Sequence, residues 1–153
     1  IREFVVVPEE TSATGKALCL SQPDIDNLVR SKAAMYTILR TLTTTVGLTF
    51  SDINTFNVAG TFGSFINPRS AITIGMLPDL PLSLFTVLGN SSLEGATLAL
   101  TDRRSISHIP GITDRLTYLE LNVNQDFMNR FSAAKFLPHT DLTRFPSVTV
   151  PGQ

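Results

Sequence analysis

The stretch that decides the fold is Thr55-Phe56-Asn57-Val58-Ala59-Gly60-Thr61-Phe62-Gly63. Its first five residues include β-branched and aromatic side chains and predict a strand over 55–59. The two glycines predict a tight turn at which a ligand can approach the backbone, because no Cβ stands in the way. Free N–H groups there can receive an anion or a sugar edge. A strand-to-helix turn without a ligand needs the same residues, so both interpretations stay open at this point.

A strand followed by glycine occurs a second time downstream. Residues 84–88 predict a strand that runs into Gly89-Asn90, and a helix follows over 91–100. Small residues at the centre of that helix allow another element to pack closely against it. They are Gly95 and Ala96.

The rest of the chain alternates between strand and helix patterns. A hairpin of two antiparallel strands is predicted over 4–20, and a long amphipathic helix follows, with a start signal at Ser21 and Asp24 and a stop signal at Gly47. We further expect a short helix over 70–77 and an irregular or weakly helical segment over 103–114, interrupted by Pro110-Gly111. A strand is predicted over 116–121 and an amphipathic helix over 126–136. From 138 onward the chain is expected to form a tail punctuated by prolines. This alternation indicates an α/β fold.

Composition limits the function classes. The 153 residues amount to one domain, with 42% hydrophobic residues and a net charge of −1, so no basic stripe is present to hold nucleic acid or an anionic membrane. The single cysteine, Cys19, excludes an internal disulfide, a four-cysteine iron–sulfur site and a cysteine-rich zinc site. No apolar run approaches the ~20 residues of a membrane span. The start, Ile1-Arg2-Glu3-Phe4, has no signal-peptide layout and suggests a cytoplasmic fragment of something larger.

Residues suited to catalysis are few and scattered. His108 and His139 have no carboxylate or nucleophile at triad spacing and are interpreted as surface loop residues. Asp79 and Glu120 are isolated carboxylates. Lys32 is either a solvated charge in the middle of a helix or a contact to a nucleotide. We therefore predict no catalytic residue and no metal site in this chain.

Several blocks, taken in their order, resemble a known family. The blocks are Leu28–Ile38, Asp52-Ile53, Val58–Phe65, Ile74–Asp79, Leu88–Ala96, Tyr118–Leu121 and Phe136–Leu142. They are similar to the C-terminal part of the ATP-dependent reductive activators of corrinoid (cobalamin) proteins, which are iron–sulfur proteins with an actin-like ATPase (ASKHA) domain. The resemblance implies an α/β fold of the ribonuclease H-like or actin-like ATPase type, a mixed sheet with flanking helices. Residues 1–137 would form the second lobe of that domain and residues 138–153 a C-terminal tail.

The resemblance also implies an activity and partners. The parent protein would return cobalt(II) corrinoid protein to cobalt(I), with electrons from a [2Fe-2S] cluster outside this segment and with ATP driving the step. The expected partners are a corrinoid protein and the missing first lobe, with a homodimer as one assembly to consider, and neither nucleic acid nor membrane. The chain contains no Asp-x-Gly-Thr, so the ATP phosphate and magnesium contacts are expected from missing residues.

Individual positions take their roles from the same resemblance. The nucleotide-binding residues would be Gly60, Thr61, Phe62, Gly63, Asn90 and Lys32, and the hinge would comprise Gly89, Gly95 and Ala96. The isolated chain would then bind nucleotide weakly and hydrolyse none. Two alternatives stay open, namely a lobe of another actin-like kinase and a non-catalytic interaction module in which the glycine turns are only tight turns.

Overall fold

The structure is a computed structural model that describes residues 3–121 and 125–149. Its strands are β1 (Glu3–Val7), β2 (Leu18–Ser21), β3 (Phe56–Ala59) and β4 (Phe85–Gly89). Its helices are α1 (Gln22–Thr45), α2 (Thr61–Phe65), α3 (Pro68–Thr73), α4 (Ser91–Thr101), α5 (Arg103–Thr113) and α6 (Gln125–Ala133). Four short 3₁₀ turns complete the regular structure of this part of the chain, at Glu9–Thr11, Phe50–Asp52, Leu82–Leu84 and Leu142–Arg144.

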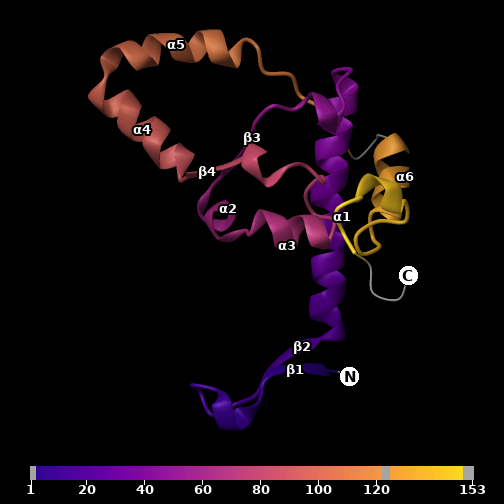
Figure 1. Cartoon of the computed structure of the whole chain (residues 1–153). Helices are drawn as coiled ribbons and strands as arrows, with labels where there is room; N and C mark the ends of the chain where they lie inside the picture. The colour runs from indigo at the N-terminus through magenta and orange to yellow at the C-terminus, as the bar shows by residue number, and fades with distance from the viewer. Residues whose placement is uncertain (1–2, 122–124, 150–153) are drawn as a thin grey trace.

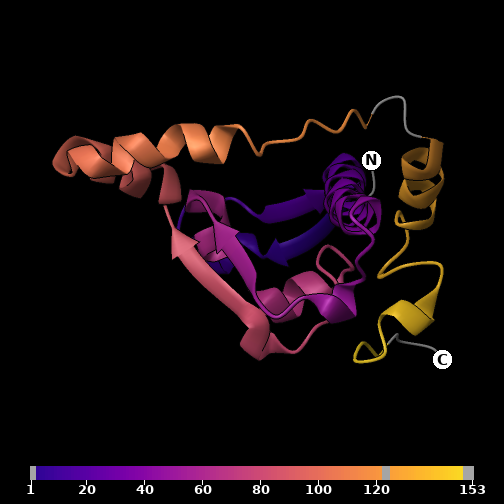
Figure 2. The same cartoon turned by 90° about the horizontal axis from the view of Figure 1, so that it is seen from above.

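The long helix α1 runs the length of the molecule, and the other elements lie along it or extend from it (Figure 1). It begins at a capping box, in which the Ser21 Oγ accepts from the Asp24 backbone N–H and the Asp24 carboxylate accepts from the Ser21 N–H at 2.9 Å. This confirms the helix start predicted from the sequence. The antiparallel hairpin of β1 and β2 lies at the N-terminal end of α1. Seen from above, β3 and β4 lie on one side of α1 and α6 on the other (Figure 2).

The core forms where α1, α3, α6 and the C-terminal segment meet. Tyr36 is 2% exposed, and its ring contacts those of Phe50, His139 and Phe145 at centroid distances of 5.8, 5.5 and 5.3 Å. Aromatic pairs at such distances add to the stabilisation from burial alone. The other buried apolar residues of this core are Ala33, Ala71, Ile72, Leu77 and Ala134.

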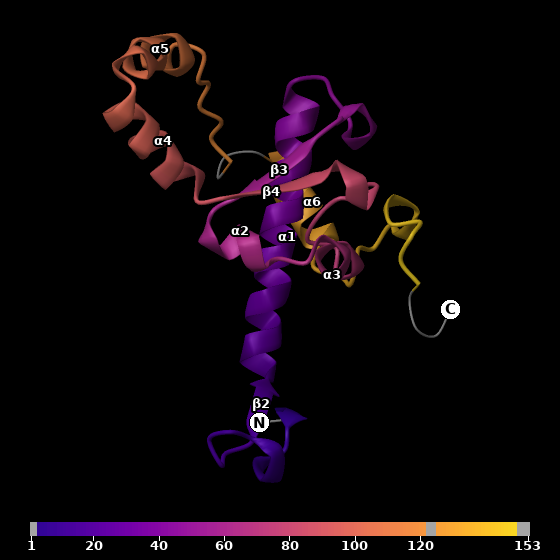
Figure 3. The same ribbon diagram turned by 60° about the vertical axis from the view of Figure 1, so that its left-hand side comes forward.

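The strands β3 and β4 pair in parallel, with Phe56 opposite Phe85 and Val58 opposite Val87. Parallel neighbours need a crossover connection, and α2 and α3 lie within it. After β4, the helices α4 and α5 form an arm that extends away from α1 (Figure 3). The predicted strands over 55–59 and 84–88 are therefore confirmed.

In the following region, the helical alternative for residues 103–114 is confirmed, whereas the interruption predicted at Pro110-Gly111 and the strand predicted over 116–121 are wrong. Residues 103–113 form the continuous helix α5, capped by the Asp102 side chain, which accepts from the Arg104 N–H at 3.0 Å. Pro110 lacks an N–H and so removes one hydrogen bond of α5, and because it lies in the last turn the helix ends only three residues later. Residues 116–121 form no strand, because an alternating pattern becomes a strand only beside a partner and none of the described strands pairs with it.

The segment after Pro138, which we expected to be a tail, packs on the core as far as it is described. Phe145 is 2% exposed. The Asp79 carboxylate accepts from the backbone N–H of Ser147 at 2.7 Å and from its hydroxyl at 2.6 Å. Residues 138–149 are thus part of the folded unit, and 150–153 lie outside the described residues.

Candidate functional site

The glycine turns after β3 and β4 lie at one edge of the parallel pair. Parallel strands bring their carboxyl ends to the same edge, where open α/β sheets bind ligands. Gly60 follows β3 with φ +94° and leads into α2, and Gly89 ends β4 with φ +68° just before α4. The Gly60 N–H donates to the Gly89 carbonyl at 2.6 Å. Two turns that are far apart in the sequence are thereby joined by a hydrogen bond.

The three glycines at this edge are required for two different reasons. A Cβ at Gly60 or Gly89 would meet no heavy atom within 4 Å, so these residues are needed for their positive φ and leave open space beside the backbone. A Cβ at Gly63 would lie 2.8 Å from Val58 Cγ1. The missing side chain of the buried Gly63 therefore lets α2 pack against β3.

The first turn of α2 and the start of α4 supply polar groups to the edge. Thr61, Phe62 and Gly63 are the first three residues of α2, and their N–H groups have no acceptor within the helix. Of these residues Thr61 is exposed and Gly63 is buried, so the start of the turn is the part open to a ligand oxygen. The side chain of Phe62 lies outside what the structure describes. Asn90 caps α4, and its Oδ1 accepts from the Leu93 N–H at 3.1 Å.

Lys32 does not lie at this edge. Its side chain is fully buried, and its ammonium donates to the carbonyl oxygens of Phe136 and Pro138, the latter at 2.6 Å. Burial lowers the pKa of Lys32 to about 8. The structure thus gives Lys32 a role in holding the segment after α6 against α1, and the predicted nucleotide contact is not supported.

The predicted hinge residues on α4 are exposed. Nothing lies within 4 Å of a Cβ built at Gly95, and Ala96 is also exposed. Close packing against this small-residue face was expected, but within residues 3–121 and 125–149 no element provides it. His139 also differs from its prediction as a surface residue, because only 8% of it is exposed.

The described residues also include a groove of about 670 Å³ away from the glycine turns, lined by α3, the 79–82 segment and residues 146–149. In the same part of the chain, no cluster of three His, Cys, Asp or Glu side chains is arranged to hold a metal ion. None of the helices described is both long enough and apolar enough to cross a membrane. The glycine edge offers backbone donors and open space, which suits binding better than bond-breaking chemistry.

Comparisons with known proteins agree with this architecture. A solved structure of a reductive activator for corrinoid, iron-sulfur protein superposes with a TM-score of 0.87 at 43% sequence identity, over 95% of this chain and 23% of that one. A corrinoid activation enzyme RamQ from Eubacterium limosum is 28% identical over 130 residues, which is 85% of this chain and 22% of the enzyme. This chain therefore spans less than a quarter of the length of either relative.

A protein-family model described as the C-terminal domain of RACo, the ASKHA domain, matches residues 1–149. The match includes β1 to α6 and the packed segment after Pro138, and so extends beyond the predicted lobe boundary at residue 137. The fold class predicted from the sequence, the actin-like ATPase type, is confirmed. The chain belongs to the family of RACo C-terminal ASKHA domains.

Proposed function

We propose that this chain supplies the adenosine-side contacts and the hinge of an ATP-dependent reductive activator that returns cobalt(II) corrinoid protein to cobalt(I). The relatives support this assignment, since both are named as activators of corrinoid proteins. The observation that carries it is the edge of the β3–β4 pair. Two glycines with positive φ leave open space beside the backbone, and the N–H groups of the first turn of α2 have no acceptor within the helix, at the position where α/β sheets bind ligands.

The hydrogen bond from Gly60 to Gly89 supports a hinge role. A ligand that orders the turn at Gly60 also acts on the start of α4, because the two turns share this bond. ATP shifts such an arrangement only by binding one conformation better than the other. The exposed face of α4 at Gly95 and Ala96 would then be the surface on which the missing part of the domain closes.

The remaining functions are assigned to residues outside this chain. The phosphates and Mg²⁺ of ATP would be held by the first lobe, and the [2Fe-2S] cluster of the parent protein would supply the electron to the corrinoid. The apolar arm of α4 and α5 fits this division, because Leu93, Leu100 and Ile112 are exposed here. Exposed apolar surface of this extent marks an interface. We expect the missing lobe to cover it.

The direct test is nucleotide binding to the full-length protein with Gly60→Val. We expect a fluorescent ATP analogue to bind about tenfold more weakly, because the side chain occupies the space beside the turn that the adenosine would fill, and the loss of one neutral hydrogen bond is worth about that factor. The matched control is Gly15→Val, which has a similar strain at φ +65° and also faces open space, in the loop between β1 and β2.

Equal binding by the two variants would contradict the assignment of the adenosine site. The activator reaction is tested separately, by following ATP-dependent reduction of a cobalt(II) corrinoid protein. Phosphoryl transfer to a small carboxylate or sugar in place of that reduction would identify another actin-like kinase. Neither activity, together with no nucleotide binding, would identify an interaction module.

A further inference from the structure

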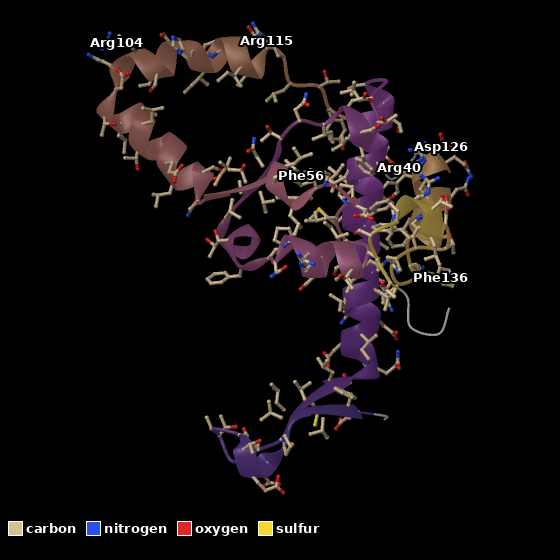
Figure 4. The ribbon with its side chains drawn as sticks, in the orientation of Figure 1. Arg40, Phe56, Arg104, Arg115, Asp126 and Phe136 are labelled. Carbon is tan, nitrogen blue, oxygen red and sulfur yellow. The ribbon has the colours of Figure 1, made fainter. Side chains whose placement is uncertain are left out.

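A second hollow, lined by several polar and charged side chains, lies on the other side of α1 from the glycine edge. It has a volume of about 250 Å³ and is formed by α1, α6 and the 3₁₀ turn at Leu142–Arg144. Its polar lining residues are Tyr36, Arg40, Asn129, Arg130, His139 and Arg144. Figure 4 shows Arg40 on the side of α1 that faces α6. The residues come from segments about a hundred positions apart, so the sequence pattern gave no sign of the cluster.

The hollow carries more positive charge than its carboxylates neutralise. Arg144 pairs with Asp141 at 2.9 Å, and Arg130 lies at 4.0 Å from the largely exposed Asp126. Arg40 has no ion-pair partner within residues 3–121 and 125–149. An exposed ion pair at 4.0 Å contributes little interaction free energy, so Asp126 offsets the charge of Arg130 only weakly. At least one guanidinium is therefore available to an anion from outside.

Two buried neutral donors lie beside these arginines. Tyr36 and His139 are 2% and 8% exposed, and both line the hollow. Within the described part of the chain the side-chain hydrogen bonds include none from the tyrosine hydroxyl or the histidine Nε2, and neither atom is among the side-chain atoms that are sealed from solvent without a partner. The histidine Nδ1 accepts from the Asp141 N–H at 2.9 Å, so the neutral ring carries its proton on Nε2. Burial lowers the pKa of His139, and the charges of Arg144 and Lys32 lower it further. The imidazole is thus a neutral donor near pH 7.

We propose that this hollow binds a small oxyanion, a phosphate or carboxylate group, with Arg40 as its principal partner. A guanidinium offers a planar fork of donors that matches such oxygens, and charge-assisted hydrogen bonds of this kind are the strong ones. The hydroxyl of Tyr36 and the Nε2–H of His139 add two neutral donors to the lining of the same hollow. The site is distinct from the proposed nucleotide site, because α1 stands between the hollow and the β3–β4 pair (Figure 2).

The test is isothermal titration of the full-length protein with inorganic phosphate and with acetate, at constant ionic strength and without nucleotide. We expect phosphate to bind and Arg40→Gln to weaken its binding about tenfold, as expected when one charge-assisted hydrogen bond is lost. Arg115→Gln is the matched control, since Arg115 is exposed and lies just after the C-terminal end of α5, outside the lining of the hollow (Figure 4). Competition by acetate would show that both kinds of oxyanion use the same site.

A second variant keeps the proposal testable if Arg40→Gln perturbs the fold, as judged by circular dichroism. Tyr36→Phe retains the core ring and removes only the hydroxyl, and we expect it to weaken phosphate binding less than Arg40→Gln but measurably. No phosphate binding to the unmodified protein would overturn the proposal. So would equal losses in the Arg40 and Arg115 variants, or a loss in Gly60→Val with none in Arg40→Gln, which would place the anion at the glycine edge.

Discussion

The α6 side of α1 and the arm of α4 and α5 contain similar apolar residues but cover them very differently. On the α6 side, Ala33 and Phe145 are 0% and 2% exposed and belong to one core. On the arm, Leu98 and Leu100 are 54% and 89% exposed. The first region completes its packing with residues of this chain. The second region presents a surface that the chain does not cover, as expected of a segment that spans less than a quarter of its relatives.

The largest effect should appear in a pair of tyrosine variants, one in the core on the α6 side of α1 and one in the exposed segment that follows the arm. Tyr36→Ala removes a buried ring with three aromatic contacts, and we expect it to lower the free energy of unfolding by about 3–5 kcal/mol. Tyr118 is 86% exposed, and Tyr118→Ala should change the same quantity by less than about 0.5 kcal/mol. Equilibrium unfolding in urea measures both. Similar losses in the two variants would mean that the regions do not differ in packing.

A pair of glycine variants extends the contrast to the hairpin, by comparing a glycine packed against the C-terminal segment with one in the exposed loop between β1 and β2. Gly75 has φ +74° and is buried, and a Cβ there would overlap the carbonyl of Pro138. We expect Gly75→Ala to cost about 2–4 kcal/mol, because steric overlap adds to the left-handed backbone strain. Gly15→Ala has comparable strain without a neighbour and should cost about 1–2 kcal/mol. Thermal unfolding of the two variants checks this. A smaller loss at Gly75 than at Gly15 would rule out the tight contact.

The smallest effect concerns the contribution of Lys32 to the pH dependence of the free energy of unfolding. Because burial lowers its pKa from 10.5 to about 8, the unfolded chain binds more protons than the folded chain between these values. Stability should therefore rise with pH through this window, by about 1 kcal/mol between pH 7 and pH 9. Lys32→Met should lose that rise, as measured by urea unfolding at each pH. An equal rise in the variant would assign the pH dependence to another group.

The sequence predicted those elements whose signals are local. The capping box at Ser21 and Asp24 fixes the start of α1 within four residues, and the glycines after β3 and β4 mark the ends of strands directly. The strand over 116–121 could not be judged in this way, because a strand depends on a neighbour that the local pattern does not identify. Pro110 suggested an interruption of α5, but a proline in the last turn destabilises the helix little, and α5 continues to Thr113.

The parts of the site that sequence reasoning missed are long-range. Lys32 follows an ordinary helical pattern, and its burial depends on carbonyl groups about a hundred residues later. The proline-rich composition after residue 138 concealed Phe145, a core residue, and His139, which is buried between rings from α1 and from the C-terminal segment. The sequence also could not distinguish the open space beside Gly60 from the close contact of Gly63 with Val58. Glycine serves both for ligand access and for close packing, so only the structure separates the two roles.

The length of α1 has a mechanical consequence. Its buried residues begin at Lys32, ten positions after its first residue, so about 15 Å of helix separates the β1–β2 hairpin from the core. The hairpin thus lies at the end of an exposed length of α1, away from the core, and Phe4 and Leu18 on it are exposed. A partner that binds this hairpin would therefore touch none of the aromatic residues around Tyr36, because that length of exposed helix separates the two.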